Sequence, residues 1–274
     1  MKINVTCVQM YPKTGDFDLN LKKICDFVHD VMSKKPNTDL IVFPELATTG
    51  YEAEKEEFHA LAETIPDGKS MKVIGELCAK YKVHIVYGFA EKDAVTTDVL
   101  YNSSLLIDDT GKVLGAYQKV HPFDTEKQWC RPGCKYPVFD TKIGKLCMFI
   151  CWDTAFPEVA RTYALKGAEL LIVPTNWEKP FSDDWDLITK ARAFDNTLPL
   201  VSANRIGDDK TLGFFGHSRI IGPTGKVIET LDEEIEGTIS AEIDLSQSRR
   251  ERVAYYTFFK DRRPDTYGEL TKLY

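Results

Sequence analysis

Residues 145–158 read KLCMFICWDTAFPE, an apolar run that ends at a cysteine and is followed by a proline. Residues 145–150 have the length and composition of a buried strand, and Pro157 suits the first turn of a helix. We therefore expect a strand, a tight turn at Cys151 and a helix. Ligands of open α/β sheets bind beyond the carboxyl ends of the strands, which makes this turn a candidate site.

Strands and helices alternate on both sides of this unit, as judged by the periodicity of their apolar residues. The expected strands cover residues 2–10, 39–43, 83–90, 145–150, 170–173, 200–204 and 237–243. The expected helices cover residues 19–31, 70–80, 157–165 and 185–196. Two hairpins with a Thr-Gly-Lys-Val turn, at residues 100–119 and around residues 219–227, add antiparallel strands. This order predicts an α/β fold with mixed sheets covered by helices.

The composition is that of an acidic globular protein. Of the 274 residues, 43% are hydrophobic and 28% are charged, which excludes collagen-like, disordered and disulfide-scaffold classes. The formal charge of -7 argues against a surface for nucleic acid or anionic membranes. No apolar stretch approaches the roughly 20 residues of a membrane span. We expect residues 1–274 to form one domain that binds neither nucleic acid nor membrane.

The cysteines and the C-terminal segment carry further expectations. The 7 cysteines, an odd number in a chain without a recognisable secretion signal, predict reduced thiols and a cytoplasmic location. Residues 253–274 combine aromatic and charged side chains, which is unusual for a free tail. We expect this segment to dock on a partner subunit or on its own domain.

Cys151 is one of three reactive side chains at expected strand ends, and the others are Glu45 and Lys119. Backbone N–H groups at a helix start lower the pKa of a nearby thiol and stabilise an oxyanion. A carboxylate beside the thiol serves as a general base, and an ammonium stabilises negative charge. Taken singly, each residue also has an ordinary interpretation, as an inert core cysteine, a capping or surface glutamate and an exposed lysine.

Three motifs in order connect these residues: FPEL at 43–46, YQKVH at 117–121 and ICWD at 150–153. With flanking segments along almost the whole chain, they resemble the three catalytic motifs of the nitrilase superfamily, the carbon-nitrogen hydrolases. The resemblance implies a four-layer αββα sandwich with two mixed sheets and assembly into homodimers. It also implies a cysteine hydrolase that needs no metal or organic cofactor.

The resemblance assigns a role to each motif residue. Cys151 would be the nucleophile, Glu45 the general base and Lys119 the stabiliser of the oxyanion, together with the backbone N–H of Trp152. Glu126, in the loop after the lysine, looks like the second glutamate that many members place there. Its alternative interpretation is a solvated loop carboxylate.

Four side chains would line the substrate pocket in this architecture. Asn176 can hydrogen-bond an amide or carboxylate, while Tyr51, Phe156 and Trp177 can supply apolar walls. Each is equally plausible in core or interface packing. As pocket residues they predict a small aliphatic or aromatic primary amide as the substrate.

The expected reaction is hydrolysis of a small amide to a carboxylate and ammonia through a thioester. The chain is shorter than the spiral-forming nitrilases, and its CWD and KDRRPDTY segments are similar to those of aliphatic amidases. A nitrilase or an N-carbamoyl amine hydrolase with the same residues is the alternative. Glu52 or Glu178 would instead favour an amine-bearing substrate by charge attraction.

Two different classes of protein are also compatible with parts of the sequence. One is a catalytically silent binding module that keeps the fold. The other has a structural zinc site formed by two C-x₃-C pairs, at residues 130–134 and 147–151. The second pair lies mostly within a strand, where its side chains would be about 13 Å apart, too far for one zinc ion.

Overall fold

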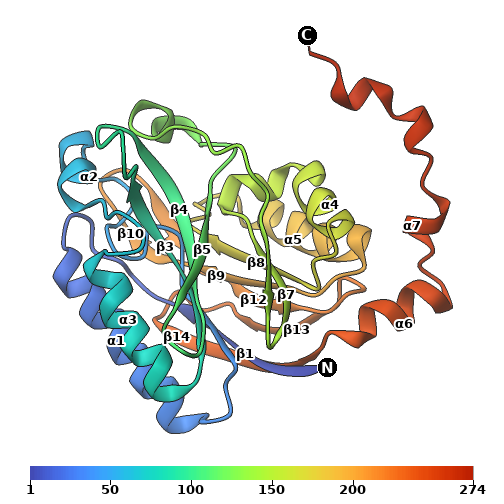
Figure 1. Ribbon diagram of the computed structural model, residues 1–274, viewed down its shortest axis with the longest axis horizontal. Coiled ribbons are helices and arrows are strands. Elements are labelled where there is room, and N and C mark those ends of the chain that lie inside the picture. Colours follow the sequence, from blue (N-terminus) through green and yellow to red (C-terminus); the bar gives the residue numbers. More distant parts are fainter. Residues whose placement is uncertain (274) are drawn as a thin grey trace.

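The structure is a computed structural model that describes residues 1–273. Its first sheet has six strands, of which β1, β2 and β3 are parallel and the remaining neighbours antiparallel. In spatial order they are β14 (Gly237–Asp244), β1 (Lys2–Gln9), β2 (Leu40–Val42), β3 (His84–Lys92), β4 (Leu100–Ile107) and β5 (Val113–Gln118). Helices α1 (Phe17–Lys34) and α3 (Lys69–Tyr81) cover its outer face (Figure 1).

The second sheet also has six strands, with β7, β8 and β9 parallel at its centre. In spatial order they are β13 (Val227–Leu231), β12 (Ser218–Ile221), β9 (Leu200–Asn204), β8 (Leu170–Thr175), β7 (Gly144–Met148) and β6 (Val138–Thr141). Helices α4 (Pro157–Leu165) and α5 (Ser182–Asn196) cover its outer face. Pro157 opens α4, as the sequence predicts.

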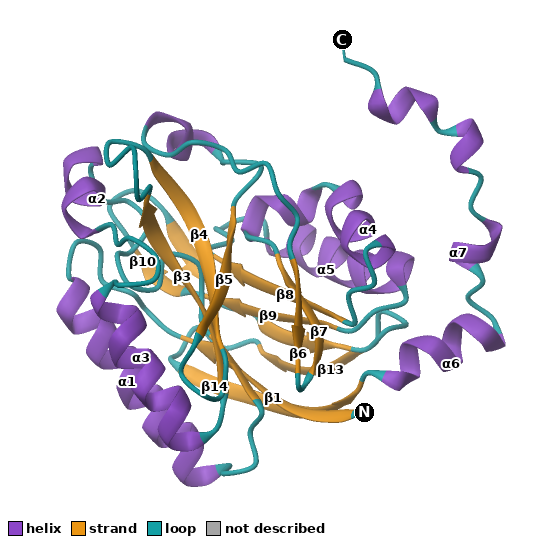
Figure 2. Cartoon of the chain, in the orientation of Figure 1, coloured by secondary structure: helices purple, strands orange, loops and turns teal. Residues whose placement is uncertain are grey.

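The inner faces of the two sheets meet and form the main core. Val5 and Val42 of the first sheet are fully buried there with Leu146 and Ile172 of the second. Because helices cover the outer faces, the central strands are apolar along most of their length. The four-layer αββα sandwich with two mixed sheets is thereby confirmed (Figure 2).

Several short elements have no counterpart in the sequence-based expectation, because they are too short to show a periodic pattern. They are α2 (Lys55–Leu61), β6, β10 (Ile206–Asp208), β11 (Gly213–Phe215), α6 (Ser246–Ala254), α7 (Phe258–Asp261) and the 3₁₀ helices η1 (Asp124–Gln128), η2 (Cys151–Ala155), η3 (Pro264–Thr266) and η4 (Gly268–Thr271). The strand expected over residues 145–150 ends at Met148, and η2 separates it from α4. Cys151 therefore begins a tight turn of its own.

The C-terminal segment leaves the body of the molecule after α6 and runs outward as an arm (Figure 1). Its first part contacts its own domain, since the rings of Tyr256 and Phe258 lie 5.7 and 5.4 Å from that of Phe194 on α5. The later part is exposed, with Leu270 66% accessible. Tyr274, which belongs to the expected docking segment, lies outside the described residues. Within residues 1–273, no helix is both long and apolar enough to span a bilayer.

Candidate active site

The three strand-end residues converge where strands of both sheets end. Glu45 follows β2, Lys119 directly follows β5, and Cys151 follows β7. The Nζ atom of Lys119 lies 2.7 Å from Glu45 Oε1 and 2.7 Å from Glu126 Oε1. The charges of these three groups act on the Cys151 thiol. The structure thus brings two carboxylates, an ammonium and a thiol together from four segments of the chain.

Glu45 is fully buried and held by fixed donors. Its Oε1 accepts a hydrogen bond from Asn102 Nδ2 at 2.7 Å, and its Oε2 accepts one from the backbone N–H of Asn176 at 2.9 Å. The backbone of Gly88 in β3 packs against the backbone of Glu45 and Leu46. A Cβ on Gly88 would lie 2.5 Å from Glu45 Cα and 2.4 Å from the Leu46 nitrogen, so the position needs a glycine.

Lys119 is buried between its two carboxylate partners. Burial lowers the pKa of its ammonium, but the charges of Glu126 and Glu45 outweigh this effect and hold the pKa well above its ordinary value. The ammonium has three N–H donors, of which the two carboxylates take two. The third remains for a ligand. Gly133 supports this segment, because its N–H donates to the Lys119 carbonyl at 2.8 Å.

Glu126 is a buried member of the site, 1% exposed, and the alternative of a solvated loop carboxylate is wrong. Burial raises its pKa to about 7; Lys119 counteracts this effect and Glu45 adds to it. The hydroxyl of Tyr51 donates to Glu126 Oε1 at 2.8 Å. The short helix η1 places the Glu126 carboxylate next to the Lys119 ammonium, a contact that the sequence pattern alone does not reveal.

Cys151 adopts a positive φ of 46°, an uncommon conformation for a residue with a side chain. Burial raises the pKa of its thiol well above the ordinary value and Glu45 raises it further, whereas Lys119 and the nearby Thr175 act in the opposite direction. The net shift of the pKa is thus upward, whatever lowering the start of the helix contributes. Desolvation dominates because the sulfur lies beneath the surface.

Asp153 fixes the turn that presents the cysteine, a role that the sequence motif did not suggest. Its Oδ2 accepts hydrogen bonds from the Tyr117 hydroxyl at 2.8 Å and from the backbone N–H of Ile150 at 3.0 Å. Its Oδ1 accepts the backbone N–H of His121 at 3.0 Å. This buried carboxylate ties the end of β5 to the turn after β7. In the sequence, the signal that could have indicated this role was the position of Asp153 two residues after Cys151.

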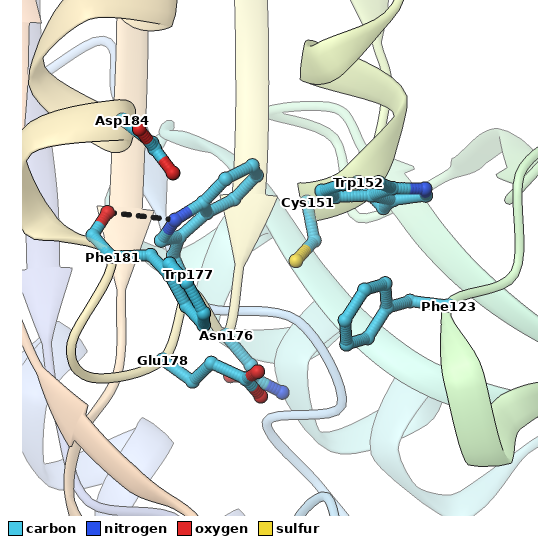
Figure 3. Close-up of a pocket in the computed structure, with 8 residues that line it drawn as sticks. All are labelled: Phe123, Cys151, Trp152, Asn176, Trp177, Glu178, Phe181 and Asp184. Carbon is cyan, nitrogen blue, oxygen red and sulfur yellow. Dashed lines mark hydrogen bonds between the residues drawn. The ribbon is translucent and has the colours of Figure 1, made fainter.

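Cys151 opens onto a cavity of about 180 Å³. The cavity is lined by Phe123, Cys151, Trp152, Asn176, Trp177, Glu178, Phe181 and Asp184. Figure 3 shows the Cys151 sulfur pointing into the space between Trp177 and Phe123. At ~30 Å³ per water molecule, this is the volume of about six water molecules, so the space suits a ligand of about six non-hydrogen atoms.

Tyr51 and Phe156 do not belong to the cavity wall, contrary to the expectation from the sequence. Tyr51 is buried, and its hydroxyl donates a hydrogen bond to Glu126. Phe156 stacks on His121 with 3.8 Å between ring centroids and meets Trp152 edge-on. The turn η2 begins at Cys151 and ends just before Phe156, so the Phe156 ring lies outside the cavity. Asn176 and Trp177, the other two side chains expected in the pocket, do line it, and so does Trp152.

Among residues 1–273, no group of three or more His, Cys, Asp or Glu side chains is arranged to hold a metal ion. The seven cysteines are all free thiols. The alternative zinc site, which would gather Cys130, Cys134, Cys147 and Cys151, does not form in this part of the chain.

Comparison with known proteins identifies the family. Residues 4–252 match the family described as carbon-nitrogen hydrolase. A probable nitrilase of Schizosaccharomyces pombe is 55% identical, covering 98% of this chain and 99% of the relative, and the omega-amidase of Saccharomyces cerevisiae is 30% identical, covering 98% and 96%. The crystal structure of a carbon-nitrogen hydrolase from Helicobacter pylori is 28% identical with a TM-score of 0.92, covering 99% of both chains. The chain belongs to the nitrilase superfamily of carbon-nitrogen hydrolases, enzymes that act on C–N bonds other than peptide bonds.

Proposed function

We propose that the protein is a cysteine-dependent amidohydrolase that converts a small amide to a carboxylate and ammonia through a thioester. The observation that carries the proposal is the Lys119 ammonium, clamped at 2.7 Å by both Glu45 and Glu126 beside the cavity-facing Cys151. This arrangement combines a nucleophile, a proton acceptor and a fixed positive charge, which are the groups that acyl transfer needs.

The first half-reaction begins with a protonated thiol, because burial raises the pKa of Cys151. Glu45 would take the thiol proton as the sulfur attacks the amide carbon. Its Oε1 already accepts from Lys119 and Asn102, whereas its Oε2 accepts only the backbone N–H of Asn176, so Oε2 is the better acceptor. The oxyanion would meet the third N–H of Lys119 and the backbone N–H of Trp152.

Breakdown of the tetrahedral intermediate completes the transfer. The protonated Glu45 would return its proton to the leaving nitrogen, the C–N bond breaks and ammonia departs, which leaves the acyl group on the sulfur. A water molecule would then lose a proton to Glu45 and attack the thioester. Cleavage of the C–S bond releases the carboxylic acid and restores the thiol.

Asn176 supports an amide over a nitrile as the substrate. Its side-chain Nδ2 and Oδ1 are buried, and neither has a hydrogen-bond partner among residues 1–273. An amide or a carbamoyl group offers both a carbonyl acceptor and an N–H donor, whereas a nitrile offers an acceptor only. Hydrolysis of N-carbamoyl amines therefore remains the second candidate, since a ureido group satisfies the same side chain.

The test is a panel of small amides, nitriles and N-carbamoyl amines assayed for ammonia release. We expect amides to have the highest kcat/KM, Cys151→Ala to abolish turnover, and Cys134→Ala, at an exposed thiol outside the cavity, to keep wild-type rates. Full activity of Cys151→Ala would refute the mechanism, and absence of turnover of every panel member by the wild type would leave a different use of the crevice, ligand binding without catalysis. Faster turnover of nitriles than amides would overturn the substrate assignment.

The C-terminal arm supports a further proposal, that two copies of the chain form a homodimer through it. Val253 and Tyr255 at the base of the arm are 79% and 78% exposed, and Leu270 farther along is 66% exposed. Large apolar side chains gathered on an extended segment gain free energy when another surface covers them. Within one copy, only the first part of the arm has ring contacts with the body.

A cytoplasmic location is also proposed. It rests on the seven free cysteines, among which Cys134 is exposed, because reduced thiols persist in reducing compartments.

A further inference from the structure

Glu178 is a charged residue of the cavity wall that the proposed mechanism does not use. Its side chain is half-buried, and within residues 1–273 no hydrogen bond or ion pair reaches its carboxylate. Burial raises the pKa of this carboxyl, and the charges of Asp124 and Glu52 raise it further. A partly desolvated carboxylate without a cation is unfavourable unless something else supplies the positive charge.

The other charges around this part of the cavity are also negative. Asp184 also lines the cavity, and the eight lining residues include no lysine or arginine. Glu52 lies outside the wall and is already engaged, since its carboxylate accepts the backbone N–H groups of Thr211 and Leu212 at 2.7 and 3.0 Å. Of Glu52 and Glu178, the two residues expected to attract an amine-bearing substrate, Glu178 is therefore the candidate that remains.

Asn176 independently marks this wall as a ligand site. It is 3% exposed, and its side-chain amide lines the cavity without a partner among residues 1–273. Figure 3 shows the side chains of Asn176 and Glu178 ending near each other, below the Cys151 sulfur and beside the Phe123 ring. One ligand can thus meet the thiol, the amide and the carboxylate within a single small cavity.

We propose that Glu178, with Asp184 at the rim, selects substrates that carry a protonated amine at the end opposite the scissile group. This inference rests on the proposed amide hydrolysis and names its substrate class: short ω-amino amides or their N-carbamoyl counterparts. The aromatic rings of Trp152, Trp177 and Phe123 would cover the methylene chain between the two polar ends. Substrates with a terminal carboxylate would meet two negative charges and no compensating cation.

The size of the cavity sets the length of the substrate. A space of about six water volumes suits an ω-amino amide with about two methylene groups, which has about six non-hydrogen atoms, at about 30 Å³ per water molecule. Longer derivatives would exceed this volume. The preference for a cation should therefore be greatest near this chain length.

The test compares three matched series of primary amides that end in an ammonium, a methyl or a carboxylate group. For the wild type we expect kcat/KM for the ammonium series to exceed that of the methyl series about tenfold, and to exceed the carboxylate series by more, as a partly screened charge pair allows. In Glu178→Gln the ratio of ammonium to methyl substrates should fall close to one. Raising the salt concentration should reduce the ratio in the wild type.

Asp183→Asn is the matched control, because Asp183 precedes Asp184 on α5 but is exposed and lies outside the cavity wall. This control should keep the wild-type ratio. An unchanged ratio in Glu178→Gln, or a wild-type preference for the carboxylate series, would overturn the inference while leaving amide hydrolysis intact.

A binding measurement separates the two proposals if no amide is hydrolysed. Binding of n-pentylammonium and of pentanoate to Cys151→Ala, followed by ligand-observed NMR, should show binding of the ammonium alone. The double variant Cys151→Ala/Glu178→Gln should lose that binding. Absence of ammonium binding to Cys151→Ala, or equal binding with and without Glu178, would refute the cation site whatever reaction the enzyme performs.

Discussion

Glu126 and Glu45 both pair with the one ammonium of Lys119. The pKa of Glu126 is raised to about 7, so at neutral pH this residue is a mixture of the neutral and ionised forms. Only the ionised form attracts the Lys119 ammonium as a second negative charge beside Glu45. The protonation state of one buried side chain thus affects how firmly Lys119, the proposed oxyanion donor, is held.

This arrangement predicts a pH dependence. A carboxyl group loses its proton as pH rises through its pKa, so the Glu126 charge is absent well below pH 7 and complete well above it. We expect kcat/KM to rise with pH through an apparent pKa of about 7, and this rise to be missing in Glu126→Gln. A Glu126→Gln profile identical to that of the wild type would assign the ionisation to another group.

At the scale of elements, backbone contact between the segment after β2 and the middle of β3 positions Glu45, the proposed general base. Gly88 lets β3 pass against the chain at residues 45 and 46, where a Cβ would come within 2.4 Å of a backbone nitrogen. Backbone atoms cannot rotate away as a side chain can, so the loop that carries Glu45 would have to move.

Gly88→Ala should therefore reduce both stability and activity. We expect the free energy of unfolding to fall by about 1–3 kcal/mol from overpacking. We also expect a loss of up to about 100-fold in kcat/KM, since a shift of about 1 Å in a catalytic group has that effect. The control is Gly222→Ala, where the nearest atom to the added Cβ is 3.6 Å away. Chemical denaturation and steady-state kinetics measure both; equal behaviour of the two variants would contradict the role of Gly88.

At the scale of the whole molecule, the arm after α6 is the part that one copy leaves most exposed. Its apolar residues adjoin a groove lined by Arg252, Val253, Tyr256 and Phe259 among others. The guanidinium of Arg252 lies 4.3 Å from the centroid of the Phe259 ring, which orders the base of the arm. The base of the arm would thus offer a second copy an apolar surface whose side chains are already ordered.

Val253→Glu should weaken the proposed dimer, because it replaces an exposed apolar side chain with a charge that would have to leave water when the interface forms. Val95→Glu is the matched control, since Val95 is 91% exposed in the loop after β3, away from the arm. Sedimentation velocity should show a larger monomer fraction for Val253→Glu than for Val95→Glu or the wild type. A monomeric wild type, or equal distributions for all three proteins, would rule out this interface.

Much of the fold was accessible from local patterns. The apolar run before Cys151, the proline at the start of α4 and the two Thr-Gly-Lys-Val turns predict elements that the structure contains, because strand burial, helix starts and hairpin turns depend on residues close in sequence. The short elements η1 and η2 escaped prediction for the same reason: a few residues show no period.

The sequence by itself determined the alternation of strands and helices and the candidates Glu45, Lys119 and Cys151, since these depend on residue order and on which side chains carry reactive groups. Only the tertiary structure decided that Glu126 is buried beside the lysine and that Phe156 turns away from the cavity. It also decided that the Cys151 thiol has a raised pKa. Burial and ion pairing arise between segments far apart in the chain, and water is excluded only after those segments have packed together.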